Sequence, residues 1–296
     1  MEQTTQIEVG ILGPLQVTVN GRPADVSGPR RTMLLAVLAL HQGRVVSVDA
    51  LIDAVWGLDD CVSSRNALHH HVVRLRAALG RTALVAFPNG YALVAAPTDA
   101  AVCEESLGAA RRALRDGDAE LAEELAGKAL SVWRGAALQG LTDTPWLQAE
   151  AHRLEELRID ALEERFEAAL VLGRHREVVS ELELAIAENP FRERLWRQLM
   201  IALYRSGRQA EALDTFRTAR NVYVEELGLE PSPELRRVQE AILAHDPALA
   251  GGEVGGRRDE LARLVQQLRA DLRRAEELYA RAVSGADDRV LAGAMA

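Results

Sequence analysis

The sequence predicts a mainly α-helical protein with a small β part, in which a mixed α+β segment precedes an all-α array of helical repeats. Three observations support this fold class. An amphipathic stretch at residues 63–80 is followed at once by a hairpin pattern, and a period of 34 residues recurs farther along the chain. Between residues 100 and 244 almost every segment has apolar residues at helical spacing, interrupted by glycines and prolines.

The stretch at residues 63–80, SSRNALHHHVVRLRAALG, predicts a helix with a buried stripe and a hydrogen-bonding face. At about 100° per residue, one side of this helix collects the apolar residues Leu68, Val72, Leu75 and Leu79. The opposite side collects Asn66, His69, His70, Val73, Arg74 and Ala77. We expect Ser63 or Ser64 to cap the N-terminus, because a serine hydroxyl accepts a hydrogen bond from a first-turn amide.

A hairpin pattern follows directly, at residues 84–95, LVAFPNGYALVA. Two apolar runs surround Asn89-Gly90, the dipeptide favoured where a two-residue turn needs positive φ. A helix with donors on its outer face, followed by a hairpin, predicts a recognition helix and its wing.

The first residues of the chain predict a small antiparallel sheet. Residues 7–19 alternate enough to form one or two short strands, and Asn20-Gly21 supplies a turn into a third strand near residues 24–26.

Two more helices are expected between this sheet and residue 63. Pro29 suits the first turn of a helix that ends at Gly43, because the first turn does not need its missing N–H. Ser47 is placed to cap a helix over residues 48–56 that ends at Gly57. Strands, three helices and a hairpin therefore arrive in the order of a winged helix.

The second part of the chain repeats itself. Gly173-Arg174 recurs as Gly207-Arg208 after 34 residues, which is the period of tetratricopeptide repeats. The same offset relates Glu177 to Glu211, Ala169 to Leu203, Leu182 to Phe216 and Ala185 to Ala219. Such helix pairs stack because one pair cannot bury its apolar face alone. Residues 100–115 and 118–133 follow the same plan less closely.

These patterns predict four parts. They are a winged-helix domain at residues 1–97, a helical-repeat domain at 98–246, a Gly-rich linker at 247–256, and a C-terminal amphipathic helix with its tail at 257–296. The C-terminal helix has either to dock on its own chain, which we favour, or to pair with a copy of itself.

The net charge of −9 is unevenly distributed along the 296 residues. Residues 1–97 carry +1 and the remainder carries −10, so a local basic patch is compatible with an acidic protein. The N-terminus has no signal-peptide pattern, no apolar run is long enough to span a bilayer, and the two cysteines match no metal-ligand spacing. We therefore expect a cytoplasmic protein with reduced thiols and no membrane association.

The outward residues of the predicted recognition helix suit DNA. Arg74 can contact guanine through two hydrogen bonds, Asn66 can bind adenine or phosphate, and Val73 can meet a thymine methyl group. His69 and His70 can donate to bases or phosphates. The alternative is that this is only the solvated face that any amphipathic helix has.

Metal binding and catalysis are not expected. His69, His70 and His71 diverge by about 100° per residue on a helix, so they cannot converge on one ion. No phosphate-binding Gly-rich loop, nucleophile elbow or Cys/His catalytic pattern is present, so we predict no cofactor and no enzyme activity.

Several separated blocks resemble the SARP-type antibiotic regulatory proteins. LGPLQVTVNGRPADVSGPRR, HQGRVVSVDALIDAVWG, RNALHHHVVRLRAALG and NGYALV resemble their OmpR-type winged-helix domain, an output domain also used in two-component systems. WRGAALQGL, GRHREVVSELELAIAENPFRERLWRQLMIALYRSGRQAEAL and ELGLEPSPEL resemble the bacterial transcriptional activation domain that follows it. The resemblance covers roughly residues 7–246. It departs from the family at His69-His70, where glutamine and valine are frequent, and at Phe87-Pro88, which replaces a basic approach to the hairpin.

The resemblance implies a DNA-binding transcriptional activator of a secondary-metabolite gene cluster. Two copies would bind direct repeats in double-stranded promoter DNA and recruit RNA polymerase with its sigma factor, in the cytoplasm at the nucleoid. Asp59 and Asp60 would be candidates for the polymerase contact, and the alternative is that they belong to an ordinary solvated loop. The DNA-contact candidates it implies are Arg30, Arg31, Asn66, His69, His70, His71, Val73, Arg74, Arg76, Asn89 and Tyr91.

Two other classes of function remain as alternatives. One is a protein-interaction adaptor whose winged helix no longer binds DNA, and the other is a regulator gated by a small molecule in the concave surface of the repeats.

Overall fold

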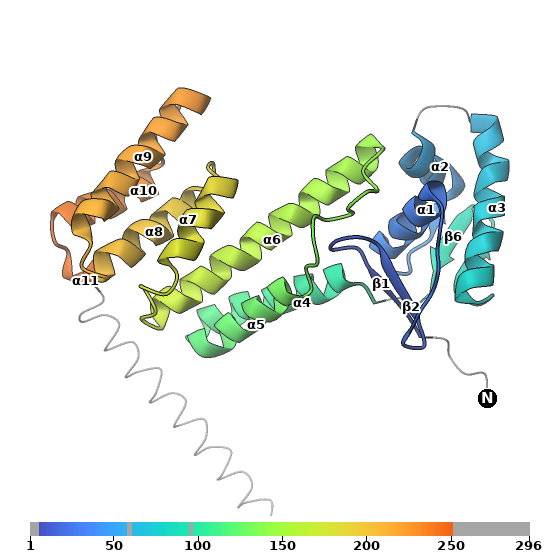
Figure 1. The fold of residues 1–296 in the computed structure, drawn as a ribbon, viewed down its shortest axis with the longest axis horizontal. Coiled ribbons are helices and arrows are strands. Elements are labelled where there is room, and N and C mark those ends of the chain that lie inside the picture. Colours follow the sequence, from blue (N-terminus) through green and yellow to red (C-terminus); the bar gives the residue numbers. More distant parts are fainter. Residues whose placement is uncertain (1–5, 58–60, 95–96, 251–296) are drawn as a thin grey trace, which may run out of the picture. The chain divides into compact units, whose positions relative to one another are not determined.

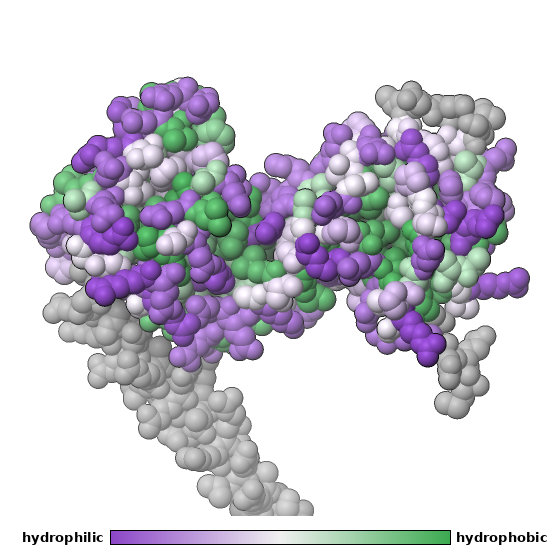
Figure 2. Space-filling model, in the orientation of Figure 1, coloured by the Kyte–Doolittle hydropathy of each residue, from purple (hydrophilic) through white to green (hydrophobic). Residues whose placement is uncertain are grey.

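The computed structural model of the protein describes residues 6–57, 61–94 and 97–250 (Figure 1). They pack as two compact units, which we call unit 1, up to Ala168, and unit 2, from Ala169 onward. In Figure 2, polar and apolar residues are mixed over the visible surface of each unit. Within these ranges no helix has both the length and the apolar character needed to cross a membrane.

Unit 1 begins with an antiparallel sheet of β1 (Ile7–Gly10), β2 (Gln16–Val19) and β3 (Arg22–Pro23). The prediction of a third strand near residues 24–26 was wrong, because that strand lies directly after the turn. Asn20 and Gly21 take φ values of 52° and 73°, and this tight turn places Arg22 opposite Val19.

Three helices follow: α1 (Pro29–Leu40), α2 (Val48–Trp56) and α3 (Cys61–Leu79). The predicted starts of two helices are confirmed. Pro29 occupies the first turn of α1, and the Ser47 hydroxyl caps α2 by accepting a hydrogen bond from the Ala50 amide at 3.2 Å. The predicted cap of α3 was wrong. The helix begins at Cys61, so Ser63 and Ser64 lie inside its first turn.

The predicted buried stripe of α3 is confirmed. Leu68, Val72, Leu75 and Leu79 are at most 1% exposed and pack in one core with α1, α2 and β1. Burying one such leucine contributes roughly 1.5–3 kcal/mol, so this stripe fixes the rotation of α3 about its axis.

The predicted hairpin is present as β5 (Leu84–Phe87) and β6 (Gly90–Leu93), with β4 (Val46–Ser47) on the other side of β6. Its predicted turn was wrong by one residue. Phe87 pairs with Gly90, so the turn is Pro88-Asn89, and neither Asn89 nor Gly90 has positive φ. Gly90 is needed for a different reason, because a Cβ there would lie 1.9 Å from the Val46 carbonyl oxygen.

The rest of unit 1 is mainly helical, with α4 (Asp99–Arg115), α5 (Ala119–Ser131) and most of α6 (Pro145–Val171). Residues of these helices, including Leu107 and Leu154, belong to the same hydrophobic core as Leu34 and Leu75 of the winged helix. The winged helix and the first helical segments therefore fold around one core.

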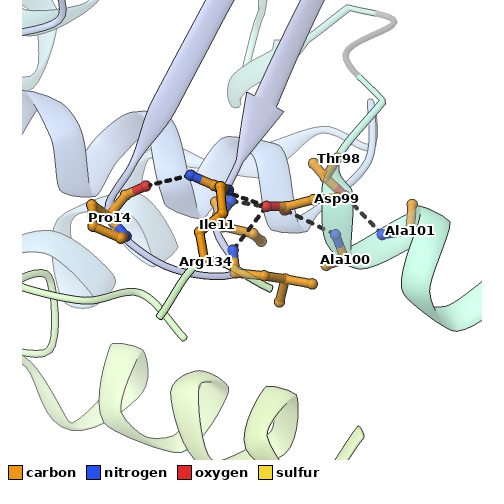
Figure 3. A network of polar contacts seen from close by, with 8 residues as sticks. Ile11, Pro14, Thr98, Asp99, Ala100, Ala101 and Arg134 are labelled. Atoms are coloured by element: carbon orange, nitrogen blue, oxygen red, sulfur yellow. Dashed lines mark hydrogen bonds and ion pairs between the residues drawn. The ribbon is translucent and has the colours of Figure 1, made fainter. Parts of the chain in front are cut away.

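A network of polar contacts centred on Asp99 joins these parts of unit 1 (Figure 3). Its carboxylate accepts hydrogen bonds from the Ile11, Leu12 and Ala100 amides at 2.8–3.0 Å and pairs with Arg134. Arg134 also donates to the Pro14 carbonyl at 3.0 Å. The loop after β1, the first turn of α4 and Arg134 thus meet at one largely buried carboxylate.

Gly10 leaves the room for this network. A Cβ at Gly10 would lie 2.3 Å from the Arg134 guanidinium, so any other residue at this position would displace the guanidinium from its present place.

Unit 2 contains α7 (Val179–Glu188), α8 (Glu193–Arg205), α9 (Gln209–Leu227), α10 (Pro233–Leu243) and α11 (Pro247–Ala250). The predicted 34-residue period appears in its backbone. Gly173 and Gly207 take φ values of 80° and 82°, and each following arginine amide donates to the residue five positions earlier, Arg174 to Ala169 and Arg208 to Leu203, both at 2.9 Å.

The period also holds for buried side chains, since Leu182 and Phe216, as well as Ala185 and Ala219, are at most 5% exposed. It fails at one helix start. α7 begins at Val179, whereas the offset from the start of α9 points to His175.

Candidate nucleic-acid interface

One continuous face of α3 is exposed to solvent. It consists of Arg65, Asn66, His69, His70, Val73, Arg74 and Ala77. Val73 is an apolar residue that is 49% exposed, and the whole of α3 contains no acidic residue. Because the opposite stripe is buried in the core, the orientation of the helix is fixed. The exposed face presents hydrogen-bond donors together with the apolar side chains of Val73 and Ala77.

Arg76 was predicted to contact DNA, and the structure gives its guanidinium another partner. Its Nε and Nη2 donate to the Leu84 carbonyl at 3.0 and 2.8 Å, and the side chain is half-buried. Arg76 therefore holds β5, the first strand of the hairpin, against α3.

The two arginines at the start of α1 are also turned inward. Arg30 donates through Nη1 to the Val55 carbonyl at the end of α2 and lies 3.7 Å from the Met33 sulfur. The Nε atom of Arg31 is buried without a hydrogen-bond partner in the described part of the chain. Arg30 thus joins α1 to α2, and Arg31 keeps only the end of its guanidinium for another partner.

His71 lies at the edge of the exposed face. Its ring contacts that of Trp56, with centroids 5.8 Å apart, and its Nδ1 atom is buried without a partner among the described residues. Burial, and then the nearby charges of Arg31 and His70, lower the pKa of His71 from its usual 6.5. The ring is therefore neutral at pH 7.

The hairpin carries two of the predicted DNA contacts, Asn89 and Tyr91, which differ in exposure. Asn89 is exposed in the turn, and its carbonyl accepts from the Val48 amide at 3.0 Å, which ties the turn to the start of α2. Tyr91 is half-buried in β6 and packs against the core. Asp59 and Asp60, the predicted polymerase contacts, lie outside the described residues.

Arg65 is an exposed residue of this face that the sequence reasoning missed. Its Nη2 atom lies 2.6 Å from Oδ1 of Asp49 in the first turn of α2. The signal was available in the spacing, because Arg65, His69 and Val73 are four residues apart and share one stripe of a helix.

The described part of unit 1 and unit 2 contains no group of three or more His, Cys, Asp and Glu side chains that could hold a metal ion. Burial raises the pKa of the Cys103 thiol, which remains protonated and unreactive inside the core at neutral pH.

Two family models match the chain. The model described as "Transcriptional regulatory protein, C terminal" matches residues 26–87, which include α1, α2, α3 and β5. The model described as "Bacterial transcriptional activator domain" matches residues 98–243.

Individual proteins are similar over most of this chain. It is 39% identical over 252 residues to the regulatory protein AfsR of Streptomyces coelicolor, a match that covers 84% of this chain and 25% of AfsR. It is 36% identical to the regulatory protein DnrI of Streptomyces peucetius, covering 82% of this chain and 94% of DnrI. The chain thus spans about a quarter of AfsR and nearly all of DnrI.

A solved structure of Mycobacterium tuberculosis EmbR, in complex with a low-affinity phosphopeptide, superposes with a TM-score of 0.79 at 33% identity. The match covers 89% of this chain and 72% of EmbR. The two domain models match the order of the winged-helix elements and of the helices that follow them, and the similarity to DnrI extends over both. The chain belongs to the SARP-type family of transcriptional regulators, which are not enzymes.

Proposed function

We propose that this protein is a transcriptional activator that reads promoter DNA with the exposed face of α3. The observation that carries the proposal is this face itself: a helix without acidic residues, held by a buried apolar stripe, turns arginine, asparagine and histidine side chains to solvent. A winged helix inserts such a face into the major groove, where side chains reach the base edges.

The residues divide into two roles. Asn66, His69, His70, Val73 and Arg74 are the base and phosphate contacts, because they are exposed on one face. Asn89 adds a contact from the wing. Arg31, His71 and Tyr91 flank this surface and reach phosphates only at its margin. Arg30 and Arg76 support the surface through the carbonyl groups they bind.

The protein partners follow from the family. Two copies bind side by side on direct repeats and recruit RNA polymerase and its sigma factor, with Asp59 and Asp60 as candidate contacts. The target is a secondary-metabolite gene cluster, and the site of action is the nucleoid in the cytoplasm. The similarity to AfsR and DnrI supports this assignment. Recruitment works because a second contact raises the local concentration of polymerase at the promoter.

The test is a binding titration of the full-length protein on promoter fragments from its own genomic neighbourhood. Specific fragments should bind with an affinity that falls steeply with salt, because phosphate contacts release counterions. Arg74→Ala should lower the affinity for the preferred fragment by roughly 5- to 100-fold and reduce selectivity.

The matched control is Arg112→Ala, which removes an exposed arginine from α4 in the same unit and should bind like wild type. If no fragment is preferred and Arg74→Ala behaves like Arg112→Ala, the protein does not read DNA through α3. The adaptor alternative would then explain the chain better.

A further inference from the structure

An acidic residue of another helix contacts the exposed face of α3. Asp49, in the first turn of α2, places Oδ1 2.6 Å from Nη2 of Arg65. Both side chains are open to solvent, with 84% of Asp49 and 63% of Arg65 exposed. Arg65 lies next to Asn66 and one turn before His69 on the face assigned to DNA.

The ion pair between Asp49 and Arg65 adds little to the stability of the free protein. Exposed ion pairs contribute about 0–1 kcal/mol, since water and salt screen them. An acid in the first helical turn interacts favourably with the helix dipole of α2, which explains Asp49 alone but not its contact with Arg65. Beside DNA, an unpaired carboxylate would repel the phosphates.

The geometry of the contact leaves Arg65 able to bind a ligand. A guanidinium has five N–H donors in a planar fork, and the contact with Asp49 uses Nη2. The remaining donors are enough for the two parallel hydrogen bonds that an arginine makes to O6 and N7 of guanine. A side chain already held in place loses less rotamer freedom on binding.

We propose that Arg65 reads a guanine in the promoter and that Asp49 is the residue that positions it. The inference rests on the proposed function, because it needs α3 in the major groove. The position of Arg65 agrees with this role, since the N-terminal residues of a recognition helix contact base edges.

The experiment is a selection of binding sites from a random-sequence DNA duplex library, carried out with the full-length protein. The variants are Arg65→Ala and Asp49→Asn, and the read-out is the base preference at every position of the selected site. Asp214→Asn is the matched control. It removes the charge of Asp214 from another exposed Arg–Asp pair, Arg217–Asp214 on α9, where the atoms are 2.7 Å apart and the side chains are 68% and 67% exposed.

Wild type should select a site with a guanine that Arg65→Ala no longer requires. The preference at that position should fall by about tenfold, while the other positions keep theirs. Asp49→Asn should weaken the preference at the same position, and adding it to Arg65→Ala should change nothing further. The control should reproduce the wild-type site.

Three results would overturn the inference while leaving the proposed function intact. The first is a wild-type site that both variants also select unchanged. The second is an equal loss of affinity of Arg65→Ala for all sequences, as a phosphate contact gives. The third is a gain of affinity of Asp49→Asn for all sequences, as removal of a repulsive charge gives. If wild type selects no site at all, the proposed function fails first.

Discussion

Among the arginine–aspartate pairs of unit 1, Arg134–Asp99 and Arg65–Asp49 have the same chemistry in very different surroundings. At the junction shown in Figure 3, Asp99 and Arg134 are 12% and 28% exposed. The Asp99 carboxylate also accepts from three amides. At the start of α3, Arg65 and Asp49 of α2 are mostly exposed and form an ion pair with each other. The same two groups therefore have a structural role in one place and remain open to a ligand in the other.

The difference is one of solvation. A buried carboxylate with all its acceptor sites used cannot be rearranged without leaving charged or polar groups unpaired. In an exposed pair the remaining donors and acceptors are hydrated, so they can exchange water for a phosphate or a base at little cost.

The largest effect is expected for Asp99→Ala. The substitution leaves the Ile11 and Leu12 amides and the Arg134 guanidinium without their acceptor, and it should lower the free energy of unfolding by about 3–5 kcal/mol. Urea unfolding of the full-length protein measures the change. Asp214→Ala, at an exposed pair, should change it by less than about 0.5 kcal/mol. Similar losses for both variants would show that burial does not separate the two kinds of pair.

Arg76 and Arg74 are two residues apart on α3. They allow a second comparison of an arginine bonded within the protein with an arginine exposed to solvent. Arg76→Ala should lower the free energy of unfolding by roughly 1–2 kcal/mol, because the buried Leu84 carbonyl loses its donors. Arg74→Ala should leave stability within about 0.5 kcal/mol of wild type.

DNA binding should show the opposite order. Arg74→Ala should reduce the salt dependence or the selectivity of DNA binding while the stability of the protein is unchanged. Arg76→Ala should lose DNA affinity only to the extent that it destabilises the folded protein. If Arg76→Ala is fully stable and loses phosphate contacts, Arg76 faces DNA rather than β5.

His71 is half-buried, whereas Arg74 on the same helix is exposed. Its pKa is lowered in the folded protein, so the unfolded chain binds the proton more readily. Its neutral form therefore favours folding above pH 6.5, and that stability is lost as the pH falls below 6.5. Unfolding measured from pH 8 to 5 should show a steeper decline for wild type than for His71→Gln. Equal slopes would mean that the burial of His71 does not affect its protonation.

The smallest effect is expected for Tyr223→Phe. Tyr223 is 6% exposed, and its hydroxyl has no partner in the described part of the chain. Burial, followed by the charge of Glu193, raises its pKa to about 12. Removing a buried hydroxyl without a partner should leave the unfolding free energy unchanged or raise it by up to about 1 kcal/mol. A loss larger than 1 kcal/mol would reveal a hydrogen bond at this site.

Local patterns were enough to predict much of the fold. The apolar spacing predicted α3 and its buried stripe, Ser47 predicted the start of α2, and the recurring Gly-Arg dipeptides predicted the matched turns at Gly173 and Gly207. These features depend on residues within one or two helical turns of each other, or on a simple repeat, so they can be read along the chain.

Details that depend on a neighbouring segment were predicted less well. Asn89-Gly90 indicated a turn with positive φ, but the register moved the turn to Pro88-Asn89 because Gly90 has to admit the backbone of Val46. The third strand moved to Arg22 for a similar reason, since pairing with Val19 begins directly after the turn.

By itself, the sequence determined the helices, their faces, the repeat and the family, because apolar periodicity and helix ends are local properties. Only the tertiary structure decided which group each arginine side chain binds. Arg74 and Arg76 differ little in sequence, yet one is exposed and the other holds Leu84. Asp49 meets Arg65, and Asp99 meets Arg134, across distances in sequence that no periodicity connects. The partner of a long, flexible side chain depends on which groups the fold places within its reach and on how exposed those groups are to water.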